Sequence, residues 1–195
     1  MSDDYTFFGI QIALRDFEQD DVRARIHALI REGVEAQALH DKRAFWKRLT
    51  AVVNEAAPAF ERGHWDLIRG AKAEAEFETW TSEIEGALAS EPEEMGAAAD
   101  EVHRLSSERY YVLITFLFLV VEGSNSDLTL RERCDIPEKA WRRRETFQRL
   151  VATPSLLNFA NVRADAVYLL PGNDSDGLST LDLASKDYAY LEPID

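Results

Sequence analysis

The residues best suited to bind another molecule lie together at positions 141–144. Trp141 is followed directly by Arg142, Arg143 and Arg144. An arginine fork binds carboxylate through two hydrogen bonds, and exposed tryptophan is enriched at the contacts that dominate protein–protein binding. This run predicts a binding surface for an acidic partner. The alternative is that the acidic helices of the chain itself neutralise the arginines, as the acidic residues between Glu74 and Glu108 would allow.

Two further residues complete the predicted binding set. Trp65 lies in the Arg62–Asp66 segment, which is typical of a turn, and Glu122 follows a long apolar run. A different interpretation is a small-molecule or catalytic site assembled from distant residues. Its candidates are Tyr110, Glu122, Arg143 and His64, which would meet near the ends of strands.

Sequence motifs for metal, cofactor or catalytic chemistry are absent. The four histidines, at positions 27, 40, 64 and 103, have no partner at helical ligand spacing, and Cys134 is the single cysteine. Asp174-x-Asp176-Gly177 begins like a calcium loop but lacks the glycine and glutamate required later. The sequence has no phosphate-binding, dinucleotide-binding or nucleophile-elbow pattern. We therefore expect no metal, no cofactor and no catalytic residue.

The charge balance narrows the class of partner. The 195 residues contain 22 Lys and Arg against 36 Asp and Glu, a net charge of -14. Nucleic acid and anionic membrane surfaces repel such a chain. The longest apolar run, Tyr110–Val121, is shorter than the roughly 20 residues that span a bilayer. The start, Met1–Asp4, is acidic and lacks a secretory signal pattern. We expect a cytoplasmic protein without nucleic-acid binding or membrane insertion.

Hydrophobic periodicity predicts three strands, over residues 5–14, 110–121 and 161–170. The first alternates, and the second is apolar on both faces, which indicates a central strand covered on both sides. Helical spacing predicts helices from about residue 21 to 34, 41 to 60 and 66 to 88. A fourth helix is expected from Ser90 after a break at Ser90–Pro92, and a fifth from Asp135. Residues 123–126 are typical of a loop.

This order of strand, four helices, strand, helix, strand and tail predicts an α+β fold. Helices would pack on a small, mainly antiparallel sheet of about three strands. We expect a single domain over residues 1–195, with a strand-plus-helical part (1–107) and a strand–helix–strand part (108–195).

The second half resembles a known family. The stretch Glu108–Thr115, continuing to Val121-Glu122-Gly123, resembles a strand of that family that ends in Glu-Gly. Asp165–Pro171 is similar to a second strand, and Leu178–Leu183 with Tyr188 and Pro193 to its closing segment. The family is the cyanobacterial and chloroplast one catalogued as domain of unknown function 1517. The resemblance implies the fold and no reaction, because the family has no established catalytic residues. Many members carry an N-terminal membrane segment and a Gly-rich stretch, and neither occurs in this sequence.

The function expected from these observations is a protein–protein interaction or scaffold module without catalytic activity of its own. A small sheet also leaves a strand edge available, so self-association into a homo-oligomer is a second expectation.

Overall fold

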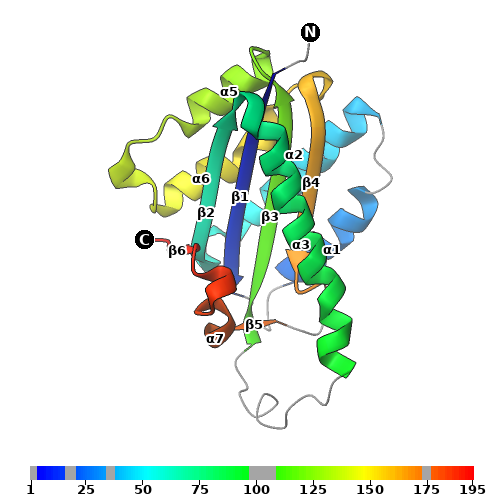
Figure 1. The fold of residues 1–195 in the computed structure, drawn as a ribbon, viewed down its shortest axis with the longest axis vertical. Coiled ribbons are helices and arrows are strands. Elements are labelled where there is room, and N and C mark those ends of the chain that lie inside the picture. Colours follow the sequence, from blue (N-terminus) through cyan, green and yellow to red (C-terminus); the bar gives the residue numbers. More distant parts are fainter. Residues whose placement is uncertain (1–3, 16–20, 34–37, 97–108, 173–176) are drawn as a thin grey trace.

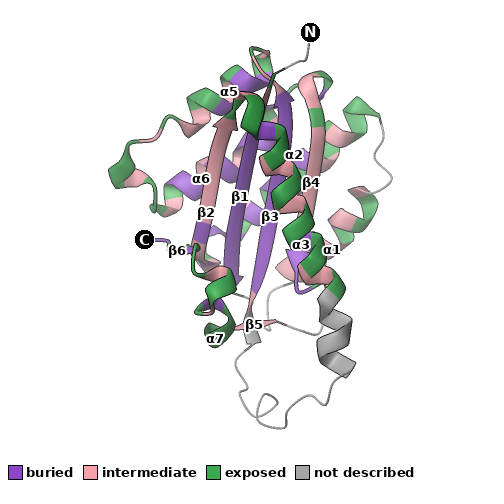
Figure 2. Ribbon diagram, in the orientation of Figure 1, coloured by how far each residue is buried: buried purple, intermediate pink, exposed green. Residues whose placement is uncertain are grey.

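The two most apolar segments of the sequence pair with each other at the centre of the structure (Figure 1). The structure is a computed structural model, and it describes residues 4–15, 21–33, 38–96, 109–172 and 177–195. Strand β1 (Tyr5–Arg15) runs antiparallel to β3 (Arg109–Val121) in unbroken register from Tyr5–Val121 to Arg15–Tyr111. Nearly all of their described side chains are buried (Figure 2). A covering layer is therefore needed on both faces, as expected for residues 110–121.

Four more strands extend this central pair. β2 (Phe60–Arg69) pairs with β1, and β4 (Val162–Leu170) pairs with β3. Two short strands, β5 (Leu178–Ser179) and β6 (Glu192–Pro193), pair with β3 and β2. The order is β4-β3-β1-β2-β6, and every pair is antiparallel. The α+β class is confirmed, but the prediction of about three strands was wrong, since the sheet has six. Both halves of the chain, 1–107 and 108–195, contribute strands to it.

Helices cover each face of the sheet. On the first face lie α1 (Val22–Gly33), α2 (Leu39–Glu55), α5 (Asn125–Cys134) and α6 (Arg144–Ala152). On the second face lie α3 (Ala73–Gly96) and α7 (Thr180–Leu183). Figure 1 shows α3 crossing the sheet diagonally. Six short 3₁₀ turns, η1 to η6, connect these elements, at Ala57–Ala59, Gly70–Lys72, Glu138–Ala140, Thr153–Leu156, Phe159–Asn161 and Lys186–Tyr188.

Strand β2 is the main element that the sequence pattern concealed. Its middle was predicted as a turn and its end as a helix start, because glycine and polar residues interrupt any alternation. In the structure, Gly63 lies where α6 packs on the strand. A Cβ atom there would lie 2.3 Å from the ring of Phe147 and 3.0 Å from Ile194. The glycine thus allows close packing of a helix on a strand, which sequence alone does not distinguish from a turn.

The helices after β3 also differ from the prediction. Residues 123–126 do not form a loop: they begin α5, where the Ser124 hydroxyl accepts a hydrogen bond from the amide of Asp127 at 3.3 Å. This is the usual role of serine at a helix N-terminus. The helix expected from Asp135 begins only at Arg144, and the intervening residues contain the η3 turn instead.

One smaller prediction was wrong as well. Ser90–Pro92 does not end α3, which continues to Gly96, because a proline removes one helical hydrogen bond without always ending a helix. The rest of the predicted fourth helix falls on 97–108, outside the described residues. Trp46 of α2 is fully buried, and its indole N–H donates to Asp165 of β4 at 2.9 Å.

Two glycine substitutions should have opposite effects. Gly63→Ala should lower the free energy of unfolding by about 1–3 kcal/mol, because the added methyl overlaps Phe147 in a packed core. Gly86→Ala should raise it by about 0.5–1 kcal/mol, because Gly86 is exposed within α3, has open space at its Cβ position and has low helix propensity. Urea unfolding of both variants measures this, and equal changes in both would contradict the packing of α6 on β2.

Candidate functional site

The structure brings Trp141 and Trp65 together. Trp141 follows the η3 turn, and its indole N–H donates to the carbonyl oxygen of Ile136 at 2.8 Å. Its ring meets the ring of Trp65 edge-on, with centroids 6.0 Å apart and planes at 79°. Trp65 packs against the core of the first face, whereas 48% of Trp141 is exposed. The Trp141 side chain is thus held in one orientation while half of it stays in solvent.

The three arginines that follow have different roles. The Arg142 guanidinium forms an ion pair with Glu192 of β6. The Arg144 guanidinium donates to the carbonyl oxygens of Pro58 at 3.2 Å and Phe60 at 3.4 Å, which lie where β2 begins. These two side chains therefore attach the η3–α6 connection to the edge of the sheet.

The backbone of the same segment holds the last described residue. The Asp195 amide donates to the Arg142 carbonyl at 2.9 Å, and the Arg144 amide donates to the Asp195 carbonyl at 3.0 Å. The strand β6 that precedes Asp195 is thereby fixed to the start of α6.

Arg143 is different from its neighbours. It is exposed, and within the described part of the chain its guanidinium has no hydrogen bond or ion pair. Its carbonyl oxygen accepts from the amides of Thr146 and Phe147 and so starts α6. Arg143 is therefore the arginine of the 142–144 run whose charge is available to a partner.

The nearby Arg133 and Arg149 also serve the fold. Arg133 donates to the carbonyl of Arg149 at 2.8 Å, and Arg149 donates to the carbonyl of Glu132 at 2.6 Å, which joins α5 to α6. Within the described ranges, none of these contacts is made to an acidic residue of the Glu74–Glu108 segment. Backbone carbonyls bind three of the arginines, and the carboxylate that pairs with Arg142 comes from a strand.

Glu122 lies at the opposite end of the sheet from this cluster. It forms an ion pair with Arg69, the last residue of β2, whereas Arg144 contacts the first. Next to it, the fully buried carboxylate of Asp127 accepts hydrogen bonds from the Thr6 hydroxyl at 2.7 Å and the Gly123 amide at 2.9 Å. A buried carboxylate with these donors fixes the turn between β3 and α5. Glu122 thus joins a structural cluster and does not share a surface with Trp141.

His64 lies in the middle of β2 and faces α3. Its ring stacks on Trp80 with centroids 5.7 Å apart and meets Tyr190 edge-on at 5.6 Å. Burial lowers the pKa of His64, partly opposed by the charges of Asp66 and Glu192. Burial also raises the pKa of Tyr190 to about 12. His64, Glu122 and Arg143 therefore occupy three separate places, and the side chain of Tyr110 lies outside the described part.

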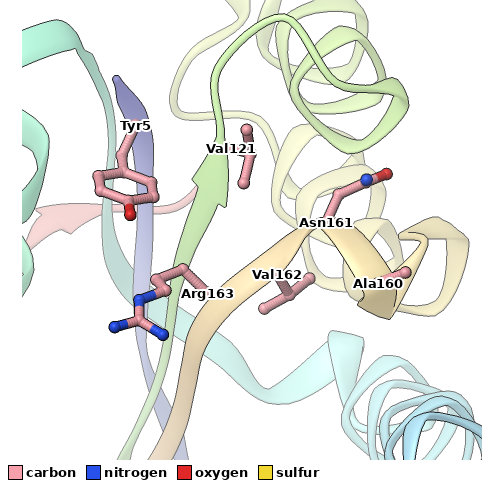
Figure 3. Close-up of a pocket in the computed structure, with 6 residues that line it drawn as sticks. All are labelled: Tyr5, Val121, Ala160, Asn161, Val162 and Arg163. Carbon is pink, nitrogen blue, oxygen red and sulfur yellow. The ribbon is translucent and has the colours of Figure 1, made fainter. Parts of the chain in front are cut away.

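A shallow hollow lies at the end of the sheet where β4 begins (Figure 3). Its volume is about 480 Å³, and its lining residues are Tyr5, Val121, Ala160, Asn161, Val162 and Arg163. Arg163 extends toward the same side as Tyr5, as Figure 3 shows. These residues come from three strands and a turn, so no local sequence pattern could have indicated the hollow.

The described residues contain no group of three His, Cys, Asp or Glu side chains placed to hold a metal ion. Burial raises the pKa of Cys134 to about 12, so its thiol stays protonated at neutral pH and is a poor nucleophile. Within the same ranges, no helix is both long and apolar enough to cross a bilayer.

No family model, no curated protein and no solved structure matches this chain.

The environment of His64 predicts how stability changes with pH. Its pKa is lower in the folded protein than the unperturbed value of 6.5, so below pH 6.5 the unfolded chain binds the proton more readily. The free energy of unfolding should fall as pH drops through this range. His64→Gln should remove that part of the loss, measured as the difference between urea unfolding at pH 7.5 and pH 5.0. A variant that keeps the full pH dependence would show that His64 does not contribute.

Proposed function

We propose that this protein is a protein–protein interaction module that binds an acidic partner through the Trp141 surface, which we define as Trp141 and Arg143. The observation that carries the proposal is the state of these two side chains. Trp141 is half-exposed and held by Trp65 and Ile136, and Arg143 is exposed without a partner among the described residues.

A fixed, exposed tryptophan suits a binding role for an energetic reason. A side chain already held in one orientation loses little conformational entropy on binding, so more of its contact energy contributes to affinity. Trp and Arg are also the residues most enriched among those that dominate binding energy. The hydrogen bond to Ile136 and the edge-on contact with Trp65 hold Trp141 in this way.

The charge of the segment favours an acidic partner. Residues 131–149 carry seven Arg or Lys against four Asp or Glu, in a chain whose net charge is -14. The Trp141 surface lies in this basic segment, and the acidic remainder of the molecule disfavours non-specific association with other anions. Such segregation of charge gives specificity and faster association with a partner of opposite sign.

The further expectations from the sequence are part of this proposal. We infer a cytoplasmic protein, in which Cys134 would be reduced. We also infer membership of the family catalogued as domain of unknown function 1517 from the resemblance of residues 108–123 and 165–193. The fold is α+β, as that resemblance implies.

The test is capture of partners with single-site variants. Tagged wild-type protein, Trp141→Ala, Arg143→Ala and the control Leu181→Ala are incubated with native lysate, crosslinked mildly and analysed by mass spectrometry. Leu181 is 78% exposed on α7 and lies outside the proposed surface. A near-stoichiometric partner should copurify with the wild type and the control and be lost from the other two variants.

Affinity for the purified partner then measures the effect. Trp141→Ala should weaken binding by about tenfold or more, the usual effect of truncating a central tryptophan. Wild-type affinity in both Trp141→Ala and Arg143→Ala would overturn the proposed surface.

A further inference from the structure

The two edges of the sheet differ in how far their backbone groups are satisfied. The amide of Glu122 donates to the carbonyl of Asp4, so even-numbered residues of β3 direct their backbone groups toward β1. In an antiparallel ladder, successive residues direct their backbone N–H and C=O groups to opposite sides of the strand. The backbone groups of odd-numbered residues of β3 are therefore directed toward β4. By the register of β3 with β4, residues 164, 166 and 168 bond to β3, and residues 165, 167 and 169 direct their N–H and C=O groups outward.

The β2 edge is largely closed. By the same alternation, the odd-numbered residues of β2 direct their backbone N–H and C=O groups away from β1. Glu61 accepts a hydrogen bond from the Ile194 amide at 3.0 Å, and Gly63 lies opposite Glu192 of β6. The amide of Leu67 donates to the side chain of Asp66 at 2.8 Å. A short covering strand and a carboxylate cap are common ways of protecting a sheet edge.

Within the described ranges, the middle of the β4 edge has no covering strand. The outward backbone groups of Asp165 and Val167 have no hydrogen-bond partner there, and both residues are partly exposed, whereas Leu169 is buried. The strand is nine residues long and contains no lysine, proline or glycine to discourage pairing. An edge of this length and composition can accept a further strand through main-chain hydrogen bonds.

The charges near β4 indicate which strand would fit. Arg163, at the start of β4, is exposed and without a partner in the described residues, and it lines the hollow together with Tyr5 (Figure 3). Near the other end, Glu85 of α3 accepts a hydrogen bond from the Tyr168 hydroxyl. The Asp165 carboxylate is already engaged by Lys42 and Trp46. A strand with its negative end beside Arg163 and its neutral end beside Tyr168 is therefore complementary.

We propose that the β4 edge binds an extended peptide segment of a partner protein, antiparallel to β4, with the acidic C-terminal end of the segment beside Arg163. The antiparallel direction follows the other pairs in the sheet. The hollow beside Arg163 and Tyr5 offers space for the acidic side chains. This site is separate from the Trp141 surface, which lies at the β2 side of the sheet.

A second copy of the chain is a poorer occupant of this edge. Antiparallel pairing of two β4 strands needs a two-fold axis perpendicular to the sheet, which places like faces side by side. Glu85 of one copy would then lie on the same face as Glu85 of the other, and each chain carries a net charge of -14. Like charges at this spacing oppose association.

The test uses a substitution that blocks only the outward edge. Val167→Pro removes an N–H that points away from β3, so the β3–β4 hydrogen bonds at Ala166 and Tyr168 are preserved. Val167→Ala is the matched control, because it loses the same packing on the first face and keeps the N–H. The probe is a synthetic decapeptide of alternating valine and threonine with two glutamates at its C-terminus. A second peptide carries two lysines in their place.

Binding is measured by ¹⁵N NMR titration at constant salt. The glutamate peptide should shift and protect the amides of Asp165 and Val167 in the wild type and in Val167→Ala. Val167→Pro should weaken its binding by about tenfold or more, as expected when a main-chain hydrogen bond is removed and the ring blocks approach. Arg163→Ala should weaken it by about two- to fivefold, the usual range for an exposed ion pair, and abolish the preference over the lysine peptide.

Three outcomes would overturn the proposal: absence of protection at these amides, equal binding by Val167→Pro and Val167→Ala, or a dimer of the free wild type in light scattering that Val167→Pro dissociates. The last outcome assigns the edge to a second copy. Trp141→Ala should bind the peptide like the wild type, so failure at the β4 edge and failure of the Trp141 surface are distinguished.

Discussion

The pairing of β1 with β3 is the interaction on which the rest of the structure depends. Both strands are buried on both faces, and their large side chains, such as Phe8, Phe116 and Phe118, are fully covered. Burial of such a side chain contributes roughly 1.5–3 kcal/mol, so leaving either face open would forfeit many times that amount. The two polar side chains at the centre, Gln11 and Thr115, hydrogen-bond to each other at 3.1 Å. The helices on the two faces and the neighbouring strands β2 and β4 cover this buried pair.

The C-terminal segment determines which surfaces remain available. β6 covers the start of the β2 edge, and the backbones of Arg142, Arg144 and Asp195 join it to α6. This attachment uses the side chains of Arg142 and Arg144, whereas Arg143 stays exposed. Trp141, two residues before Arg143, packs edge-on against Trp65 of β2. Among the described residues, no such strand covers β4. The molecule therefore presents two different candidate surfaces on the two sides of its sheet: a basic, aromatic one and an open strand edge.

The sequence predicted those parts of the fold that depend on long apolar patterns. Residues 5–14, 110–121 and 161–170 became β1, β3 and β4 because their composition alone requires burial in a sheet. The sequence pattern did not predict β2, because Gly63 is required by its contact with Phe147, a residue far away in the chain. β5 and β6 are too short to have a pattern. The α5 start was hidden because Gly-Ser-Asn-Ser also suits a loop, and its capping serine is recognised only with the helix present.

The residue types in the sequence indicated candidate binding residues, but they only partly indicated which of these residues lie together. The structure brings Trp141 and Trp65 into contact, and Arg143 lies two residues after Trp141 in the chain. Glu122 does not belong there, and the roles of Arg142 and Arg144 depend on carbonyl and carboxylate groups of β2 and β6 that no local pattern indicates. The hollow and the open edge arise from tertiary arrangement alone.

Amide-resolved hydrogen exchange of the free protein is the most direct measurement of this arrangement. The amides of Asp165 and Val167 should exchange about 100-fold faster than those of Ala164, Ala166 and Tyr168, because only the second set donates to β3. Slow exchange at all five positions would contradict it, since it would mean that the outer edge of β4 is already paired.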